Sequence, residues 1–284
     1  MVAGCRMDMN SLTRYGKAAL IGGRNLIVGA NLASLRWLTK PRQLLGYVNE
    51  TLFLLRTYNG VRKLEQRNVF EVLPADATQT VQLGALDRRG GVYGEPWFHA
   101  VASYSVDIVS LCLLCRITKP RTVFEIGTLK GYTAYHLALN TEPDARVFTL
   151  DLPGDRSVSP ALKTTLVDCA HLPTEQRDYC FAGAGVAEKI TTLIGDSAMF
   201  DYTPFLARVD LFFIDGAHSY EYVRSDTENA LRCCHSGSII AWHDYGRVGV
   251  NGVSRWLHEL ARTHEVYSVP GGSLAYMVVG SGAA

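Results

Sequence analysis

Short apolar runs alternate with longer amphipathic segments through the second half of the chain. Five of these runs read as strands, and they cover residues 123–126, 147–150, 190–194, 209–214 and 238–242. Runs of this length and apolar character are typical of parallel strands that are buried on both faces. Helical segments separate them, so the alternation predicts a doubly wound α/β sheet that is mostly parallel.

Two further runs close the pattern. Val266–Val269 and Leu274–Val279 are separated by Pro270–Gly272. A proline followed by two glycines marks a tight connection, which predicts an antiparallel hairpin. This C-terminal hairpin would form one edge of a seven-stranded sheet.

Residues 1 to about 70 read as helical, and a loop-rich stretch follows them. Ser11 is a suitable cap for a first helix, which would end near Lys40 because Pro41 cannot continue it. A second helix shows an apolar stripe formed by Leu44, Val48, Leu52 and Leu55. We expect residues 1–85 to form an N-terminal helical appendage that packs on the main domain, covers its site as a lid or makes a homodimer contact. Residues 86–284 would form the main domain.

The charge balance points away from nucleic acid. The chain has 28 Lys and Arg against 27 Asp and Glu, a formal net charge of +1, so no global field favours a polyanion. Polar residues interrupt the apolar segment Ala18–Leu35, which predicts no integral membrane span but leaves peripheral contact open. The first residues do not resemble a secretory leader, and the seven cysteines are odd in number and irregularly spaced. We therefore expect a cytoplasmic protein.

A glycine turn directly follows the first core strand. Gly127 comes after the run 123–126, Gly131 lies four residues further on, and residues 132–140 read as a helix. A strand that ends in a glycine turn and leads into a helix is the ligand-binding corner of a doubly wound sheet.

Every predicted core strand carries an acid at or beside its C-terminal tip. The five acids are Glu125, Asp151, Asp196, Asp215 and Asp244. Parallel strand tips meet at one edge of a sheet, and helix capping explains a single acid better than a set of five. Because crowded carboxylates repel each other, the pattern predicts a cation, a hydroxyl-rich ligand or shared protons at this edge.

The second acid suggests a nucleoside. Asp151 lies 24 residues after Gly127 (151 − 127), a spacing at which a carboxylate can accept from both ribose hydroxyls. NAD and S-adenosylmethionine both offer such a ribose. The turn lacks the G-x-G-x-x-G spacing that holds a pyrophosphate, and an acidic edge suits a sulfonium and an ammonium group better than a diphosphate. The pattern therefore favours S-adenosylmethionine.

Five segments carry a family resemblance. They are F-E-I-G-T-L-K-G-Y-T, T-L-D-L-P, L-I-G-D-S-A-M-F-D, L-F-F-I-D-G-A-H-S-Y-E-Y-V and W-H-D-Y. As a group they resemble the class I S-adenosylmethionine-dependent methyltransferases. The nearest branch contains bacterial macrolide-sugar O-methyltransferases and cephalosporin-hydroxylase-like proteins. The similarity extends over about residues 91–279 and implies a Rossmann-like fold.

The resemblance implies roles along the cofactor. The residues at the methionine end would be Glu125, Gly127, Thr128 and Gly131. Asp151 would hold the ribose hydroxyls, Asp196 would accept from the adenine amino group, and Ser197 would lie beside it. The alternative for Asp196 and Ser197 is that they cap the following segment.

The same resemblance places the chemistry beyond the fourth and fifth core strands. Asp215 would bind magnesium and approach the methyl group, and His218 would act as a base. A second metal pair is His243–Asp244, 28 residues after Asp215 (243 − 215), where the family often has Glu-Asp. Magnesium prefers oxygen ligands. His243 therefore either stays out of contact with the metal or shifts the preference toward a transition metal.

These residues predict O-methyl transfer assisted by a divalent cation. Asp215 and Asp244 would hold the cation, which lowers the pKa of the substrate hydroxyl, and His218 would remove the proton near neutral pH. The acceptor would be a small hydroxylated molecule such as a sugar, a catechol or another secondary metabolite. The alternative for His218 is a packing or helix-cap role, and a structural role is equally open for His243.

Two other functions stay open. Asp215 or Asp244 together with His218 and His243 has the composition of a non-haem iron oxygenase site, and the resemblance to cephalosporin-hydroxylase-like proteins agrees with that. The third possibility is a binding protein that keeps the cofactor pocket without catalysis.

Overall fold

The structure is a computed structural model, and it describes residues 64–73, 79–83, 101–154, 157–165, 168, 178–247 and 250–280. The predicted helices before residue 64 lie outside these ranges. The boundary predicted at residue 85 also lies outside them, so the division into two domains stays a prediction. Among the described helices, none is long and apolar enough to cross a bilayer.

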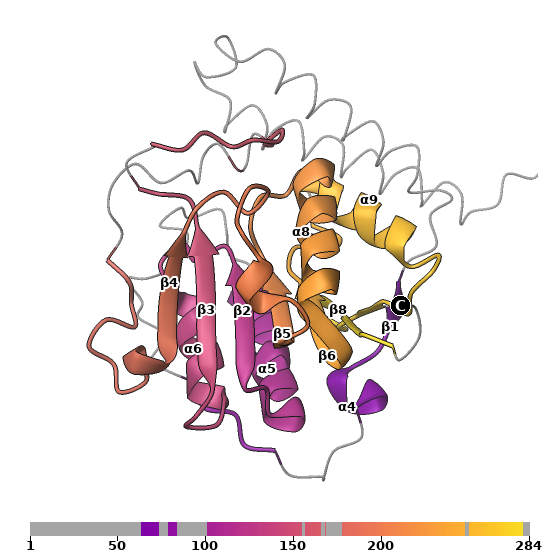
Figure 1. Cartoon of the computed structure of the whole chain (residues 1–284). Coiled ribbons are helices and arrows are strands. Elements are labelled where there is room, and N and C mark those ends of the chain that lie inside the picture. The colour runs from indigo at the N-terminus through magenta and orange to yellow at the C-terminus, as the bar shows by residue number, and fades with distance from the viewer. Residues whose placement is uncertain are drawn as a thin grey trace, which may run out of the picture.

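The described strands form one eight-stranded sheet in the order β1-β7-β8-β6-β5-β2-β3-β4 (Figure 1). Their bounds are β1 Glu65–Gln66, β2 Thr122–Ile126, β3 Arg146–Asp151, β4 Ile190–Ile194, β5 Val209–Ile214, β6 Cys234–Trp242, β7 Tyr267–Ser268 and β8 Ala275–Val278. The block β6-β5-β2-β3-β4 is parallel throughout. The predicted doubly wound, mostly parallel fold is therefore confirmed.

Helices cover both faces of the sheet. On one face lie α5 (Val101–Thr118) and α6 (Tyr132–Asn140), which stand behind the strands in Figure 1. On the other face lie α8 (Tyr220–Cys233) and α9 (Asn251–Leu260). Single-turn elements connect the rest: α4 (Val69–Val72), η1 (Ala187–Lys189) and η2 (Thr203–Phe205).

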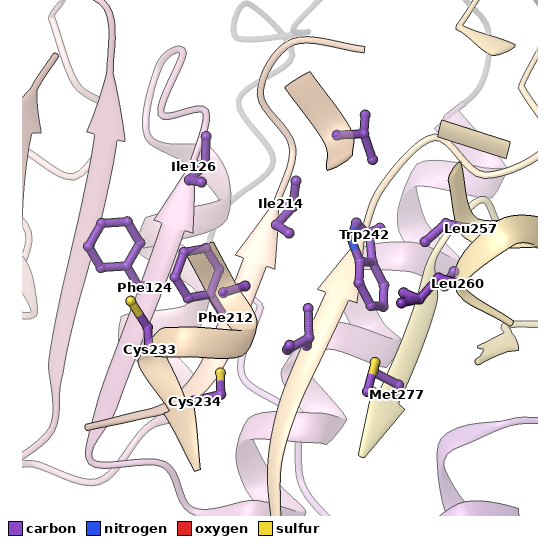
Figure 2. Packing of buried hydrophobic residues seen from close by; sticks show 14 of the residues in the cluster. Phe124, Ile126, Phe212, Ile214, Cys233, Cys234, Trp242, Leu257, Leu260 and Met277 are labelled. Carbon is purple, nitrogen blue, oxygen red and sulfur yellow. The ribbon is translucent and has the colours of Figure 1, made fainter. Parts of the chain in front are cut away.

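The alternation of side chains along each strand divides the core into two layers. Phe124, Phe212 and Trp242 point toward the layer beneath α8 and α9, and the rings of Phe124 and Phe212 stack with centroids 4.8 Å apart (Figure 2). Their sequence neighbours, such as Val123 and Phe213, pack with α5 and α6 on the other face. Burial on both faces explains why these strands appear in the sequence as nearly continuous apolar runs.

The C-terminal hairpin has the predicted antiparallel pairing. β8 pairs antiparallel with both β6 and β7 and so lies between them. The structure adds an eighth strand, because β1 pairs parallel with β7 and covers the outer edge of the hairpin. β1 lies within the range predicted to be helical. Two polar residues at its two positions give no apolar run that could have predicted it.

Candidate active site

The glycine turn brings the tips of β2 and β5 into close contact. Gly127 has φ +98°, and a Cβ on it would lie 2.0 Å from the carbonyl oxygen of Asp215. Gly131 has φ +75°, and its Cβ would lie 2.3 Å from the Phe181 ring. Neither position tolerates a side chain, because the backbone conformation and the space both exclude one. Both glycines therefore have a packing role within the protein itself.

Glu125 lies fully buried beside this turn. The Thr149 hydroxyl donates to its Oε2 at 2.5 Å, and the hydroxyls of Thr149 and Thr128 lie 2.6 Å apart. Oε1 has no hydrogen-bond partner among the described residues. Burial raises the pKa of Glu125 well above its ordinary value, which favours the neutral carboxyl. Its second oxygen remains available to a ligand group.

Asp151 is fixed at the tip of β3. Its Oδ2 accepts from the backbone N–H of Leu129 at 2.8 Å, and its Oδ1 accepts from that of Leu152 at 2.8 Å. A carboxylate oxygen can accept more than one hydrogen bond. The two amides therefore orient Asp151 and still leave it able to receive hydroxyl donors.

Asp196 is more fully bound by the protein. Its oxygens accept from the N–H groups of Ala161 at 2.6 Å and Ala198 at 3.0 Å, and from the Tyr222 hydroxyl at 2.9 Å. Asp196 is only 4% exposed, and Ser197 beside it is 8% exposed. This bonding ties the loop around Ala161 to α8, which gives Asp196 a structural role whatever it contributes to a ligand.

His218 lies between two carboxylates. Its Nδ1 is 2.6 Å from Oδ1 of Asp168, and its Nε2 is 2.8 Å from Oδ2 of Asp244. Burial opposes a charge on the ring, but the bonds with Asp168 and Asp244 hold the pKa of His218 well above its ordinary value. Both ring nitrogens face a carboxylate, an arrangement that favours the protonated ring.

His243 is held in the same way on the other side of Asp244. Its Nδ1 lies 3.1 Å from Oδ1 of Asp215 and 3.2 Å from Oδ1 of Asp244, and its Nε2 lies 3.2 Å from Oδ2 of Asp107. Burial opposes the charge, but the carboxylates Asp215, Asp244 and Asp107 hold the pKa of His243 well above its ordinary value. These carboxylates therefore favour the protonated form of the His243 ring.

Asp244 is the centre of this network. It has φ +63°, a conformation that Asp adopts more readily than most residues, and its Oδ1 also pairs with Nη1 of Arg247 at 2.8 Å. Burial would raise the pKa of Asp244, but His243 and His218 hold it well below its ordinary value. Asp244 is therefore a fully ionised carboxylate inside the protein.

Three side chains can together hold a metal ion. One ligand atom each from Asp215, His218 and Asp244 lies within 4.8 Å of the others. This set contains His218 where the sequence analysis placed His243, and the rings of both histidines border the same small pocket. The pocket is lined by Ile214, Asp215, Gly216, Ala217, His218, Val223, Trp242, His243 and Val253.

Sequence reasoning missed the carboxylates that support the two histidines. Asp107 lies on α5, where it accepts from the N–H groups of Ser273 at 2.7 Å and Leu274 at 2.9 Å. Asp168 lies in the long connection between β3 and β4. A single acid within the apolar run of α5 was a signal for Asp107. Nothing in its local sequence distinguished Asp168.

A comparison with known families agrees with this architecture. Residues 124–245 match a family model described as a methyltransferase domain. The matched segment contains all five strand-end acids. Asp107 and Ser273 lie outside it.

Solved structures with related architecture share little sequence with the chain. The O-methyltransferase TomG from Streptomyces achromogenes, involved in tomaymycin synthesis and solved with S-adenosylmethionine, is 23% identical. That similarity covers 64% of this chain and 82% of TomG, with a TM-score of 0.43. An O-methyltransferase from Bacillus cereus, solved with S-adenosylhomocysteine, is 20% identical over 64% of this chain and 83% of its own, with a TM-score of 0.42. No curated protein matches the chain.

The sheet order and the match of residues 124–245 to a methyltransferase-domain model are consistent with a class I S-adenosylmethionine-dependent methyltransferase fold. The match of residues 124–245 to a methyltransferase domain agrees with the class that the sequence motifs suggested. The narrower branch suggested by those motifs stays a prediction.

Proposed function

We propose that this protein transfers a methyl group from S-adenosylmethionine to a hydroxyl of a small molecule, assisted by a divalent cation. The observation that carries the proposal is the position of three possible metal ligands. Asp215, His218 and Asp244 come together at the same sheet edge as the glycine turn and Asp151. Ligands of doubly wound sheets bind at this edge.

The residues at the tips of β2 and β3 would bind the cofactor, which supplies an activated methyl group when it is bound. The free oxygen of Glu125 suits the ammonium of the methionine end, beside Gly127, Thr128 and Gly131. Asp151, already oriented by two amides, would accept from the ribose hydroxyls. Asp196 and Ser197 would shape the adenine end, where Asp196 fixes the loop around Ala161.

The residues at the tips of β5 and β6 would act on the acceptor. Asp215, His218 and Asp244 fit a divalent cation, and such an ion lowers the pKa of a bound hydroxyl. These side chains orient the hydroxyl toward the methyl group, and positioning supplies most of the rate gain because the sulfonium is already reactive. The hydroxyl proton would be lost to solvent once its pKa is lowered, because His218 can accept a proton only while its ring is neutral. Its two carboxylate partners disfavour that form at neutral pH.

Two measurements test this proposal. Calorimetry with S-adenosylhomocysteine should show micromolar or tighter binding, weakened at least about tenfold in Asp151→Asn, because a neutral amide accepts less strongly from the ribose. Transfer of a labelled methyl group to a panel of hydroxylated sugars and catechols should then depend on an added divalent cation. Absence of S-adenosylhomocysteine binding would refute the proposal, and binding without transfer to any panel member would support the non-catalytic alternative.

The iron oxygenase alternative receives no support from the geometry. That chemistry uses two imidazoles and one carboxylate with open positions. The set brought together here has one imidazole and two carboxylates.

A further inference from the structure

The three possible metal ligands Asp215, His218 and Asp244 include one imidazole, that of His218, and the protein holds its ring in one orientation. Nε2 of His218 and Oδ2 of Asp244 are 2.8 Å apart. Neighbouring ligands around an ion with bonds of about 2.1 Å are separated by about 3 Å, so a cation could replace the proton between these two atoms with little movement. Asp215 completes the set within 4.8 Å.

Asp168 fixes the His218 ring. The same oxygen, Oδ1, receives both Nδ1 of His218 at 2.6 Å and the backbone N–H of His218 at 3.0 Å. Asp168 is itself only 7% exposed and is anchored by the N–H of Thr165 at 2.6 Å. The ring therefore cannot turn freely, and its Nε2 points at Asp244. A histidine that ligates a metal usually donates its other N–H to a carboxylate in this way.

His243 has a different position. Its Nδ1 approaches one oxygen of Asp215 and one of Asp244, while Asp107 binds its Nε2. Gly272 makes room for this support, because a Cβ there would lie 2.0 Å from Oδ1 of Asp107. His243 is not among the three residues whose ligand atoms lie within 4.8 Å of one another, and its contacts instead orient the two carboxylates.

We propose that His218 is a metal ligand positioned by Asp168, rather than the proton acceptor, and that the centre selects a transition metal over magnesium. The assignment rests on the proposed metal-assisted function. Magnesium favours an all-oxygen set with several waters, whereas one imidazole with two carboxylates suits Mn²⁺, Fe²⁺, Co²⁺ or Zn²⁺. Asp168 is then a positioning residue for the ligand, and His243 with Asp107 positions the carboxylates.

The direct test uses the full chain stripped of metal and loaded with Mn²⁺. Pulsed electron paramagnetic resonance detects a nitrogen bound directly to the ion. We expect this nitrogen signal in the parent protein and in His243→Gln, and its loss in His218→Asn. A parent protein without the signal would overturn the assignment, and so would a signal lost in His243→Gln but kept in His218→Asn.

Metal selectivity gives a second readout that does not need activity. Titration of the stripped protein with Co²⁺, followed by visible absorption, should give an affinity at least about 100-fold above that for Mg²⁺ measured by competition. Asp168→Asn should lower the Co²⁺ affinity about 10- to 100-fold. His235→Asn is the matched control, because it removes an imidazole from a surface pair with Asp210, and it should change nothing. Equal affinity for Mg²⁺ and Co²⁺ would overturn the selectivity.

Calorimetry with S-adenosylhomocysteine separates the two proposals. Each variant should bind S-adenosylhomocysteine as the parent does, which shows that the domain is folded. If the parent binds no S-adenosylhomocysteine but shows the Mn²⁺ nitrogen signal, the methyl-transfer proposal fails and the ligand assignment stands. If His218→Asn does not fold, the parent's nitrogen signal and the Asp168→Asn titration still decide the assignment.

Discussion

At the scale of single residues, a buried carboxyl of α8 sets a pH dependence of stability. Asp226 is fully buried, and neither oxygen has a hydrogen-bond partner with acceptable geometry among the described residues. Burial raises its pKa to about 7, against an opposing effect of the nearby Ser197 hydroxyl. The folded state therefore keeps this proton to higher pH than the unfolded chain does.

The sign of the effect follows from that difference. The contribution of Asp226 to stability is fully present below the unfolded pKa near 4 and is lost as pH rises through about 7. The total loss is on the order of 4 kcal/mol. Urea unfolding at pH 5.5 and 8.5 should show a smaller drop in the free energy of unfolding for Asp226→Asn than for the parent. Equal drops in the two proteins would show that Asp226 is already ionised when folded.

Glu125 provides a second prediction at this scale. Glutamine preserves the shape and the neutral state of the buried group, so Glu125→Gln should change the free energy of unfolding by less than about 1 kcal/mol. The variant cannot become an anion, so its affinity for S-adenosylhomocysteine should fall about tenfold or more. Thermal unfolding and calorimetry measure the two effects. A large loss of stability with unchanged affinity would instead assign Glu125 a purely structural role.

The acids of the site could be predicted from the sequence, but their partners could not. Strand-end residues are recognisable because an apolar run ends just before them. Asp107 reaches His243 from 136 positions away (243 − 107), and Asp168 reaches His218 from 50 positions away. Contacts this distant depend on how helices and connections pack, which residue types and local spacing do not encode. The same packing decides that His218, rather than His243, lies with Asp215 and Asp244 as a possible metal ligand.

At the scale of elements, the turn after β2 depends on glycine for two separate reasons. In Gly127→Ala the new Cβ meets the backbone of Asp215, and the φ of +98° is strained for any other residue. We expect a loss of about 3 kcal/mol or more in the free energy of unfolding. Gly183→Ala is the matched control, because its φ is +76° but no atom lies within 4 Å of its Cβ. It should lose only about 1 kcal/mol, and denaturant titrations of both variants check the comparison.

The succession of strands and helices along the chain was predictable because buried parallel strands appear in the sequence as apolar runs. The five predicted runs correspond to the five strands of the parallel block. The edge of the sheet was less predictable. β1 has only two residues, both polar and exposed, and it pairs because Tyr267 and Ser268 of the hairpin offer it an edge. A strand that forms through its partner carries no hydrophobic pattern of its own.

At the scale of the whole molecule, one tyrosine connects three distant parts of the chain. The Tyr245 hydroxyl accepts from the N–H of Leu64 at 3.0 Å and lies 2.9 Å from Nε2 of His258 on α9. Burial lowers the pKa of His258, so the neutral ring can accept the tyrosine proton. Because Tyr245 follows Asp244 directly, the segment that begins β1 is linked to the loop of the site.

Removing this hydroxyl should loosen the segment before β1 without disturbing the sheet. In Tyr245→Phe the amide of Leu64 loses its acceptor, so its hydrogen exchange should accelerate at least about tenfold while amides of β2 and β5 exchange as before. Exchange measured by mass spectrometry checks this outcome. Tyr267→Phe serves as the control, because among the described residues that hydroxyl bonds the exposed Glu265 and no other. An unchanged rate at Leu64 would mean that other contacts hold the segment.

The position of β8 between β6 and β7 has a consequence for how the protein is made. Ribosomes release the N-terminal part of a chain first, so α5 and the parallel strands emerge long before residues 275–278. Until then Asp107 lacks its hydrogen bonds with Ser273 and Leu274. His243, which follows β6, then lacks a fully oriented Asp107 as its partner. A nascent chain paused before the hairpin would carry every strand-end acid in sequence but would lack the support that sets their geometry. Competence of this site is thus acquired only after Ser273 and Leu274 have been synthesised.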